Sequence, residues 1–140
     1  MSLLQTAYIV RKNVPDRQAL QAAVDSTGFD CKLDESYIPF ESSGFLPCSI
    51  NGKKSGFEIS FEPASEPLAV FPQLGERVGG RDVAITFRWG GDMAECTCVL
   101  IVSLALAKDF GAIVHYQDDD LLYSTEQLVD EAAAALKHLH

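Results

Sequence analysis

The feature that most constrains the fold is the stretch ITFRWGGDMAECTCVLIVSLALAKDF, residues 85–110. Apolar side chains occupy every second position from 83 to 89, which is the period of a strand that buries one face. Two glycines then break the pattern, and Asp92 is a good N-cap for a helix, with Glu95 placed to complete a capping box. The stretch therefore predicts a strand, a tight turn and a helix in direct succession.

The predicted helix is unusually apolar. From residue 93 to residue 107 only Glu95, Thr97 and Ser103 interrupt the apolar run. A surface helix would carry a charged stripe on every turn, so this helix is expected to be buried on most of its circumference. A membrane span is the competing interpretation, but the run falls short of about 18–20 apolar residues and Asp109 follows it closely. We therefore expect a core helix.

The chain before this stretch predicts a strand, a helix and a hairpin. A strand is expected over 3–10, and a helix that begins near Pro15, which suits the first turn. Asn51-Gly52 separates two strand-like runs and is a strong hairpin signal, because both residues tolerate positive φ. The register set by this turn puts the apolar residues of both strands on one face.

The remaining segments complete the expected architecture. Residues 63–80 hold three prolines and three glycines, and predict a loop with one helical turn around 73–78. A short strand is expected over 111–116, and Ser124 and Gln127 form the capping box of an amphipathic last helix. This order predicts a single α+β domain over 1–140, a two-layer sandwich of a mostly antiparallel sheet, a buried central helix and a capped amphipathic C-terminal helix.

The negative charge is concentrated near the C-terminus. The chain has a net charge of −9, and residues 92–140 carry nine acidic side chains against two basic ones. Such a surface repels nucleic acid and anionic lipid and attracts a basic protein, although it also serves solubility. The basic residues near the N-terminus follow the apolar run, the reverse of a secretory signal. We expect a cytoplasmic location, unless a preceding signal segment has been removed.

No common catalytic motif is present. The sequence lacks a phosphate-binding glycine loop, a serine nucleophile elbow and a zinc-protease helix motif. Cys96 and Cys98 are two residues apart on the predicted helix and point nearly opposite ways, while Cys31 and Cys48 belong to other elements. We expect four dispersed thiols that pack as small hydrophobes, with no metal, no cofactor and no catalytic residue.

Two clusters remain as candidates for function. The turn after Trp89 would expose part of the indole beside carboxylates, which is a good anchor for a basic partner, although a purely structural role is the simpler explanation. His115 with Asp118 and Asp120 could form an acid–base or metal site, although an acidic connection is usually only solvated.

The strings SGFLPC, SGFEISF and FRWGGDMAECTCVLIVSLALAKDFGAIVHYQDDDLLYSTEQL resemble a group of small, uncharacterised bacterial proteins over residues 40–135. In that group an FRWGGD-x-x-E turn leads into an alanine-rich helix, a short strand, an acidic segment and a last helix. This resemblance implies the fold rather than an activity. In size, charge and architecture the chain also resembles immunity proteins, which neutralise secreted bacterial toxins.

These observations predict an acidic protein-binding module of the immunity type that binds and neutralises a basic secreted toxin. The residues expected to contact the partner are Trp89, Asp118, Asp119, Asp120, Glu126 and Asp130. The alternative is a small enzyme or ligand-binding protein with a site between the 63–80 loop and the 89–92 turn. The sequence predicts no oligomeric state.

Overall fold

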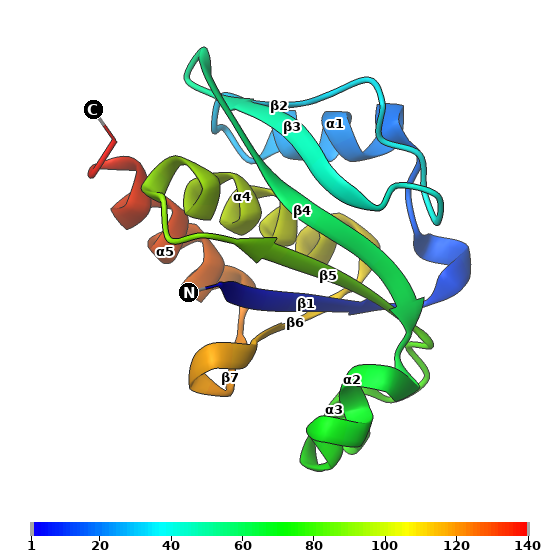
Figure 1. The fold of residues 1–140 in the computed structure, drawn as a ribbon. Coiled ribbons are helices and arrows are strands. Elements are labelled where there is room, and N and C mark those ends of the chain that lie inside the picture. The colour runs from blue at the N-terminus through cyan, green and yellow to red at the C-terminus, as the bar shows by residue number, and fades with distance from the viewer. Residues whose placement is uncertain (1, 140) are drawn as a thin grey trace.

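The computed structural model describes residues 2–139, which form an antiparallel sheet with helices on both of its faces (Figure 1). The strands are β1 (Leu3–Ile9), β2 (Cys31–Leu33), β3 (Gly44–Ile50), β4 (Lys53–Pro63), β5 (Val83–Trp89), β6 (Ile113–Tyr116) and β7 (Leu121–Tyr123). The helices are α1 (Arg17–Ser26), α2 (Ser65–Val70), α3 (Gly75–Val78), α4 (Met93–Phe110) and α5 (Thr125–Leu136), with 3-10 turns η1 (Arg11–Asn13), η2 (Pro72–Leu74) and η3 (Gln117–Asp119). The seven strands follow the order β2-β3-β4-β5-β1-β6-β7, which confirms the α+β fold class.

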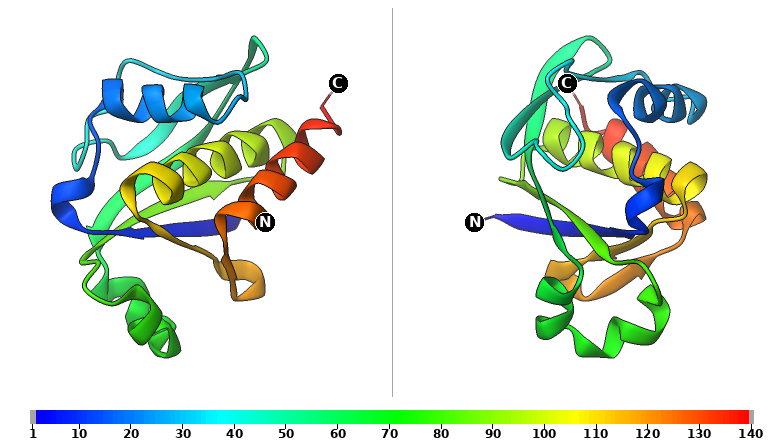
Figure 2. Two further views of the ribbon diagram at one scale, coloured as in Figure 1. Left: turned by 180° about the vertical axis from the view of Figure 1, so that it is seen from behind. Right: turned by 90° about the vertical axis from the view of Figure 1, so that its right-hand side faces the viewer.

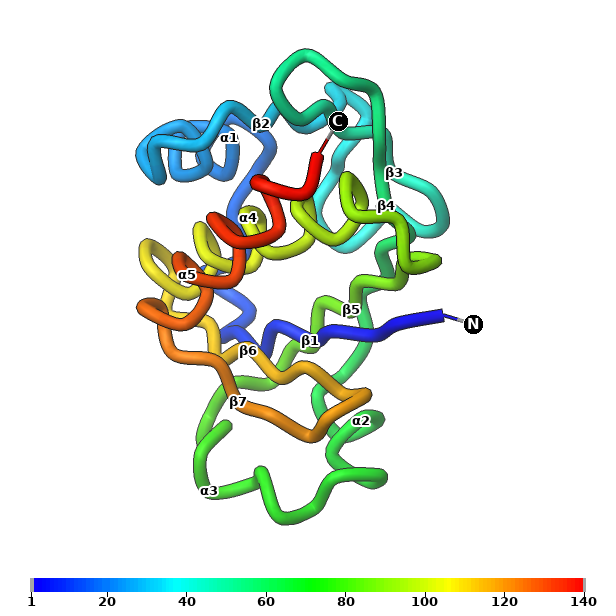
Figure 3. Tube along the Cα trace, turned by 90° about the vertical axis from the view of Figure 1, so that its left-hand side faces the viewer, coloured from blue at the N-terminus to red at the C-terminus, as the bar shows by residue number. Residues whose placement is uncertain are grey.

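The long apolar helix α4 lies at the centre of the protein. It packs against the sheet between α1 and α5, so these three helices form one layer (Figures 2 and 3). Every residue from 97 to 106 is buried, as expected for a helix without a charged stripe. Gly111 ends the helix in the left-handed conformation, with φ of 73°, and its N–H bonds to the Leu106 carbonyl. Among the described residues, no helix is both long enough and apolar enough to cross a membrane.

The segment 63–80 covers one end of the opposite sheet face. It contains α2, η2 and α3, so the expectation of a loop with one helical turn is wrong outside that turn. The segment packs on the sheet in a second small core, in which Leu74 and Val78 contact Tyr8 and Ala84. This packing explains why the segment is helical. Pro72 stands in the first turn of η2, where its missing N–H costs no hydrogen bond.

The hairpin of β3 and β4 has the register that its turn predicts. Ile50 pairs with Lys53, and Leu46 lies opposite Phe57 on the face that packs against the helices. The turn residues Asn51 and Gly52 have φ angles of 51° and 79°, as a type I′ turn requires.

The helix caps agree with the sequence in part. Ser124 and Gln127 form the expected capping box at the start of α5. Asp92 caps α4 by accepting from the Ala94 N–H, but the Glu95 carboxylate accepts from the Gly90 N–H instead of closing a box. The expected box at α4 is therefore wrong in its second half, and Glu95 instead holds the turn against the helix.

Candidate functional site

Three aromatic side chains from β5, β6 and β7 stack in series across one side of the sheet, in which β1 lies between β5 and β6. The Trp89 and Tyr116 ring centroids are 6.2 Å apart with an interplanar angle of 27°, and those of Tyr116 and Tyr123 are 6.1 Å apart at 13°. In β1, Leu3 pairs with Trp89 and Gln5 pairs with Tyr116, so both rings lie on the helix-covered face. We refer to Trp89, Tyr116 and Tyr123 as the aromatic stack.

The aromatic stack runs from the core towards the surface. The Trp89 side chain is only 4% exposed, and its Nε1 is buried without a hydrogen-bond partner among residues 2–139. The expectation that the indole is an exposed anchor is therefore wrong, because strand alternation places it on the core face. Tyr116 and Tyr123 are half-buried, so they are the rings of the stack that a partner can reach.

In the acidic run after β6, two carboxylates make hydrogen bonds within the fold and one does not. The Asp118 Oδ1 accepts the Leu4 N–H at 3.0 Å and so holds the start of β1. The Asp120 carboxylate lies 2.8 Å from His115 Nε2 and also accepts from the Gln73 amide at 3.2 Å. Asp119 is exposed and makes no side-chain hydrogen bond or ion pair in the described part of the chain. Of this run, Asp119 is the carboxylate most available to a partner.

Helix α5 extends this negative surface. Glu126, Asp130 and Glu131 are all exposed on it, and within residues 2–139 none of their carboxylates is engaged in a hydrogen bond or salt bridge. Between these acids, Val129 is 43% exposed, and Leu121 in β7 is 47% exposed. Carboxylates interspersed with exposed apolar side chains are a composition suited to contact with a protein.

The pKa values of Tyr116 and Tyr123 are raised in part by carboxylates that lie close to the aromatic stack. Burial, together with the Glu131 carboxylate, Tyr116 and Asp119, raises the pKa of Tyr123 to about 12. Burial also raises the pKa of Tyr116, as do Asp118 and Asp119. Both phenols are therefore neutral near pH 7 and lie in a negative field. Glu131 joins the site only through the packing of α5 on β7, and sequence reasoning did not assign it.

The alternative site of His115, Asp118 and Asp120 is brought together only in part. The His115–Asp120 pair forms, but Asp118 binds the backbone of β1 instead. The His115 side chain is 0% exposed, and Phe71 packs edge-on against it with ring centroids 4.6 Å apart. Phe71 covers the buried imidazole and Gln73 bonds to Asp120, so the pair ties the 63–80 segment to the sheet, and the imidazole offers no substrate access.

The expected site between the 63–80 segment and the 89–92 turn is also wrong. The segment joins the sheet beside Val83, where Pro63 pairs, and the turn follows Trp89 at the other end of β5. Seven residues of strand separate the two by about 20 Å, so they cannot line one small-molecule site.

The cysteines are not dispersed as the sequence suggested. Cys31, Cys48 and Cys98 come from three elements, yet their sulfur atoms all lie within 4.8 Å of one another. Cys96, on the same helix as Cys98, points away from this group towards α5. Within the described residues, these three thiols are the group of side chains best placed to hold a metal ion.

Comparison of the sequence with protein-family models and with curated proteins finds no match. The functional proposal accordingly rests on the geometry and charge of the residues described above.

Proposed function

We propose that the chain is an acidic protein-binding domain that holds a basic protein on one surface. This surface consists of the half-buried tyrosines of the aromatic stack and the free carboxylates beside them. We call it the aromatic–acidic surface, and its members are Tyr116, Asp119, Tyr123, Glu126, Asp130 and Glu131. The observation that carries the proposal is that exposed carboxylates accompany two stacked, half-buried tyrosines.

Each part of this surface has a role in recognition. Tyr116 and Tyr123 give rigid apolar contact area with few rotatable bonds, and each phenol supplies a polar group at its edge. The surrounding carboxylates attract lysine and arginine side chains and accelerate the encounter with a basic partner. The same charge repels the phosphates of nucleic acids, so a nucleic-acid ligand is disfavoured.

Within this class we propose an immunity-type inhibitor, which neutralises a secreted toxin by covering a basic surface on it. The support is the general resemblance in size, charge and architecture, together with a surface of matching charge sign. Inhibition needs no chemistry from the inhibitor, and the sealed His115 is consistent with a role in which binding alone is sufficient.

Capture of the partner tests the binding role. The tagged chain is incubated with extract of its native organism, and stoichiometric partners are identified by mass spectrometry. We expect a basic protein whose association slows at least tenfold with the double variant Asp119→Lys/Asp130→Lys and whose salt dependence flattens. Glu35→Lys/Glu41→Lys, a double reversal of exposed charges outside the aromatic–acidic surface, is the matched control and should change association little. Absence of any stoichiometric partner would overturn the proposal.

Co-expression tests the inhibitor role separately. The captured protein is expressed in a bacterial host with the wild-type chain, with the double variant or alone. Rescue of growth by the wild-type chain and loss of rescue with the double variant would support inhibition. If the partner binds but is harmless when expressed alone, the toxin assignment fails while the binding role stands.

A further inference from the structure

Three buried thiols meet at the β2–β3 end of the sheet. The Cys31 and Cys48 sulfur atoms are 3.3 Å apart, and the Cys98 sulfur completes a group within 4.8 Å. In the sheet, Cys31 pairs with Ile50 and Cys48 with Leu33, so both cysteines face α4, which contributes Cys98. We call these three residues the thiol cluster.

A buried hydroxyl beside the thiol cluster is unsatisfied. Ser55 pairs with Cys48 across the β3–β4 hairpin, and its Oγ is buried without a hydrogen-bond partner within residues 2–139. The Ser55 side chain also lies beside Cys98. A buried polar atom without a partner is uncommon in a packed interior, and three purely apolar thiols would not require a hydroxyl beside them.

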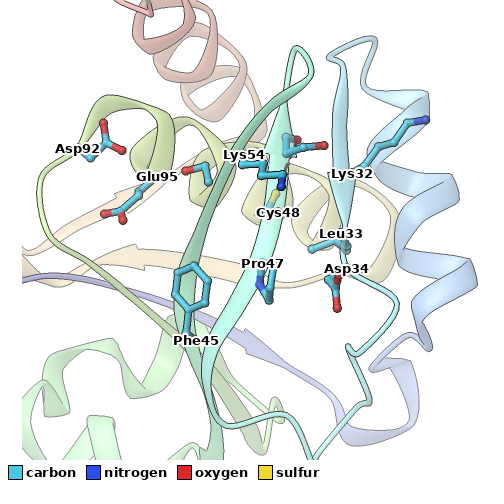
Figure 4. Close-up of a pocket in the computed structure, with 11 residues that line it drawn as sticks. Lys32, Leu33, Asp34, Phe45, Pro47, Cys48, Lys54, Asp92 and Glu95 are labelled. Carbon is cyan, nitrogen blue, oxygen red and sulfur yellow. Dashed lines mark hydrogen bonds between the residues drawn. The ribbon is translucent and has the colours of Figure 1, made fainter.

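The thiol cluster borders a cavity that gives access from solvent. A cavity of about 770 Å³ is lined by Cys48 and Ser55, and Asp92 and Glu95 lie across it from Cys48 (Figure 4). The other charged side chains of its lining are Asp34, Lys32 and Lys54, so charges of both signs surround the mouth. Cys48 is 4% exposed, and Cys31 and Cys98 lie deeper at 1% and 0%.

The sulfur chemistry suits a soft cation. With metal–sulfur bonds of about 2.3 Å, three thiolates around one ion have sulfur atoms about 3.8 Å apart, close to the spacing of the thiol cluster. Thiolate ligands without carboxylate or imidazole select d10 ions such as Zn²⁺ and Cu⁺.

We propose that Cys31, Cys48 and Cys98 bind one Zn²⁺, with the fourth position directed towards the Ser55 hydroxyl or a water from the cavity. On binding, three sulfur–zinc bonds form, and the protons of the Cys31, Cys48 and Cys98 thiols pass to solvent. Three thiolates and Zn²⁺ leave one negative charge in the core, whereas Cu⁺ would leave two, so the charge favours Zn²⁺. The ion joins β2 and β3 to α4 and stabilises the fold.

A zinc titration of the full chain tests this proposal. The protein is reduced, freed of metal with a chelator and titrated with Zn²⁺ against a chromogenic competitor, with Co²⁺ as a spectroscopic probe. We expect one ion per chain, thiolate-to-cobalt charge-transfer absorbance, a rise in Tm and release of about three protons, since bound thiols must be deprotonated.

Matched variants separate a built site from adventitious binding. Cys48→Ala and Cys98→Ala should each weaken Zn²⁺ binding at least 100-fold, and Ser55→Ala should weaken it less. Cys96→Ser, on the same helix but outside the thiol cluster, should bind as the wild type does. Circular dichroism establishes that each variant is folded. Folded wild-type protein that binds no Zn²⁺, or binds it as well as Cys98→Ala does, overturns the proposal. A site that takes only Cu⁺ overturns the assignment to Zn²⁺.

Discussion

The two ends of the sheet differ in their side chains, a thiol cluster at one end and tyrosines with carboxylates at the other, although helix α4 contributes a cysteine to both. At the β2–β3 end, Cys98 of α4 joins the buried thiol cluster. At the β6–β7 end, Cys96 of α4 lies near Tyr116 and Tyr123, beneath exposed carboxylates. Two residues along a helix turn the side chain by about 200°, so neighbouring cysteines face opposite ends of the molecule.

The surroundings of these two cysteines set opposite pKa shifts. The pKa of Cys98 is lowered because the Cys31 and Cys48 thiols donate to its sulfur. Burial raises the pKa of Cys96 to about 11, and the Glu131 carboxylate adds to the rise. We assign ion binding to one end because three sulfur atoms lie within 4.8 Å of one another there, and protein binding to the other because exposed carboxylates and half-buried tyrosines occur there.

The largest expected effect is on stability at the base of the aromatic stack. Trp89→Ala should reduce the free energy of unfolding by about 3–5 kcal/mol, because it removes a large ring from the core and leaves a cavity. Tyr123→Phe retains the ring and should change stability far less. Urea denaturation followed by circular dichroism measures both. If Trp89→Ala costs less than about 1 kcal/mol, the indole is not the structural base of the stack.

Alkaline pH should destabilise the protein through its buried phenols. Burial raises the pKa of Tyr8 and of Tyr123 from 10 to about 12, so the folded state keeps protons that the unfolded state has lost. Stability should therefore be independent of these groups below pH 10 and fall as the pH rises from 10 through 12. Denaturation across this range measures the effect. Tyr123→Phe should make the fall less steep, and an unchanged pH dependence would contradict the environment assigned to Tyr123.

The reactivity of the two cysteines on α4 compares the two ends directly. Cys96 is partly accessible with a raised pKa, so its alkylation by iodoacetamide should speed up about tenfold per pH unit between 7 and 9, as the thiolate fraction grows. Cys98 is fully buried and should react only when the protein opens. Peptide mass spectrometry resolves the two sites. Labelling of Cys98 before Cys96 in folded protein would show that the thiol cluster is not closed.

The smallest expected effect concerns the helix that carries most of the free carboxylates. Ser124→Ala removes the side chain that accepts the Gln127 N–H at the start of α5 and should cost about 1 kcal/mol of stability. Thermal denaturation measures the loss. Ser36→Ala, at an exposed turn position far along the chain, serves as the control and should cost less. Equal losses would show that the capping box contributes no special stability.

Local patterns in the sequence predicted the secondary structure well wherever it depends on residues that are close together in the sequence. The β3–β4 register, the α5 capping box and the burial of α4 all follow from turn chemistry and hydrophobic periodicity. The short strands β2 and β7 were missed, because three residues give too little periodicity to detect. The 63–80 segment is helical because it packs against Tyr8 and Ala84, a contact that its own proline-rich sequence does not encode.

The candidate sites were harder to predict because they depend on contacts between distant strands. The acidic run was identified, but its sequence could not show that Asp118 and Asp120 are held by Leu4 and His115 while Asp119 is free. Alternation correctly placed Trp89 on a core face, which argues against exposure. The thiol cluster needs the pairing of β2 with β3 and the rotation of α4, neither of which the spacing of the cysteines reveals.

Hydrogen exchange of the chain, alone and bound to its captured partner, tests the central claim most directly. Amide protection on binding should increase within residues 116–131, which carry the aromatic–acidic surface, and should be unchanged within residues 31–55, which contain β2, β3 and the hairpin turn. Protection confined to residues 31–55, with none over 116–131, would contradict the assignment of protein binding to the β6–β7 end.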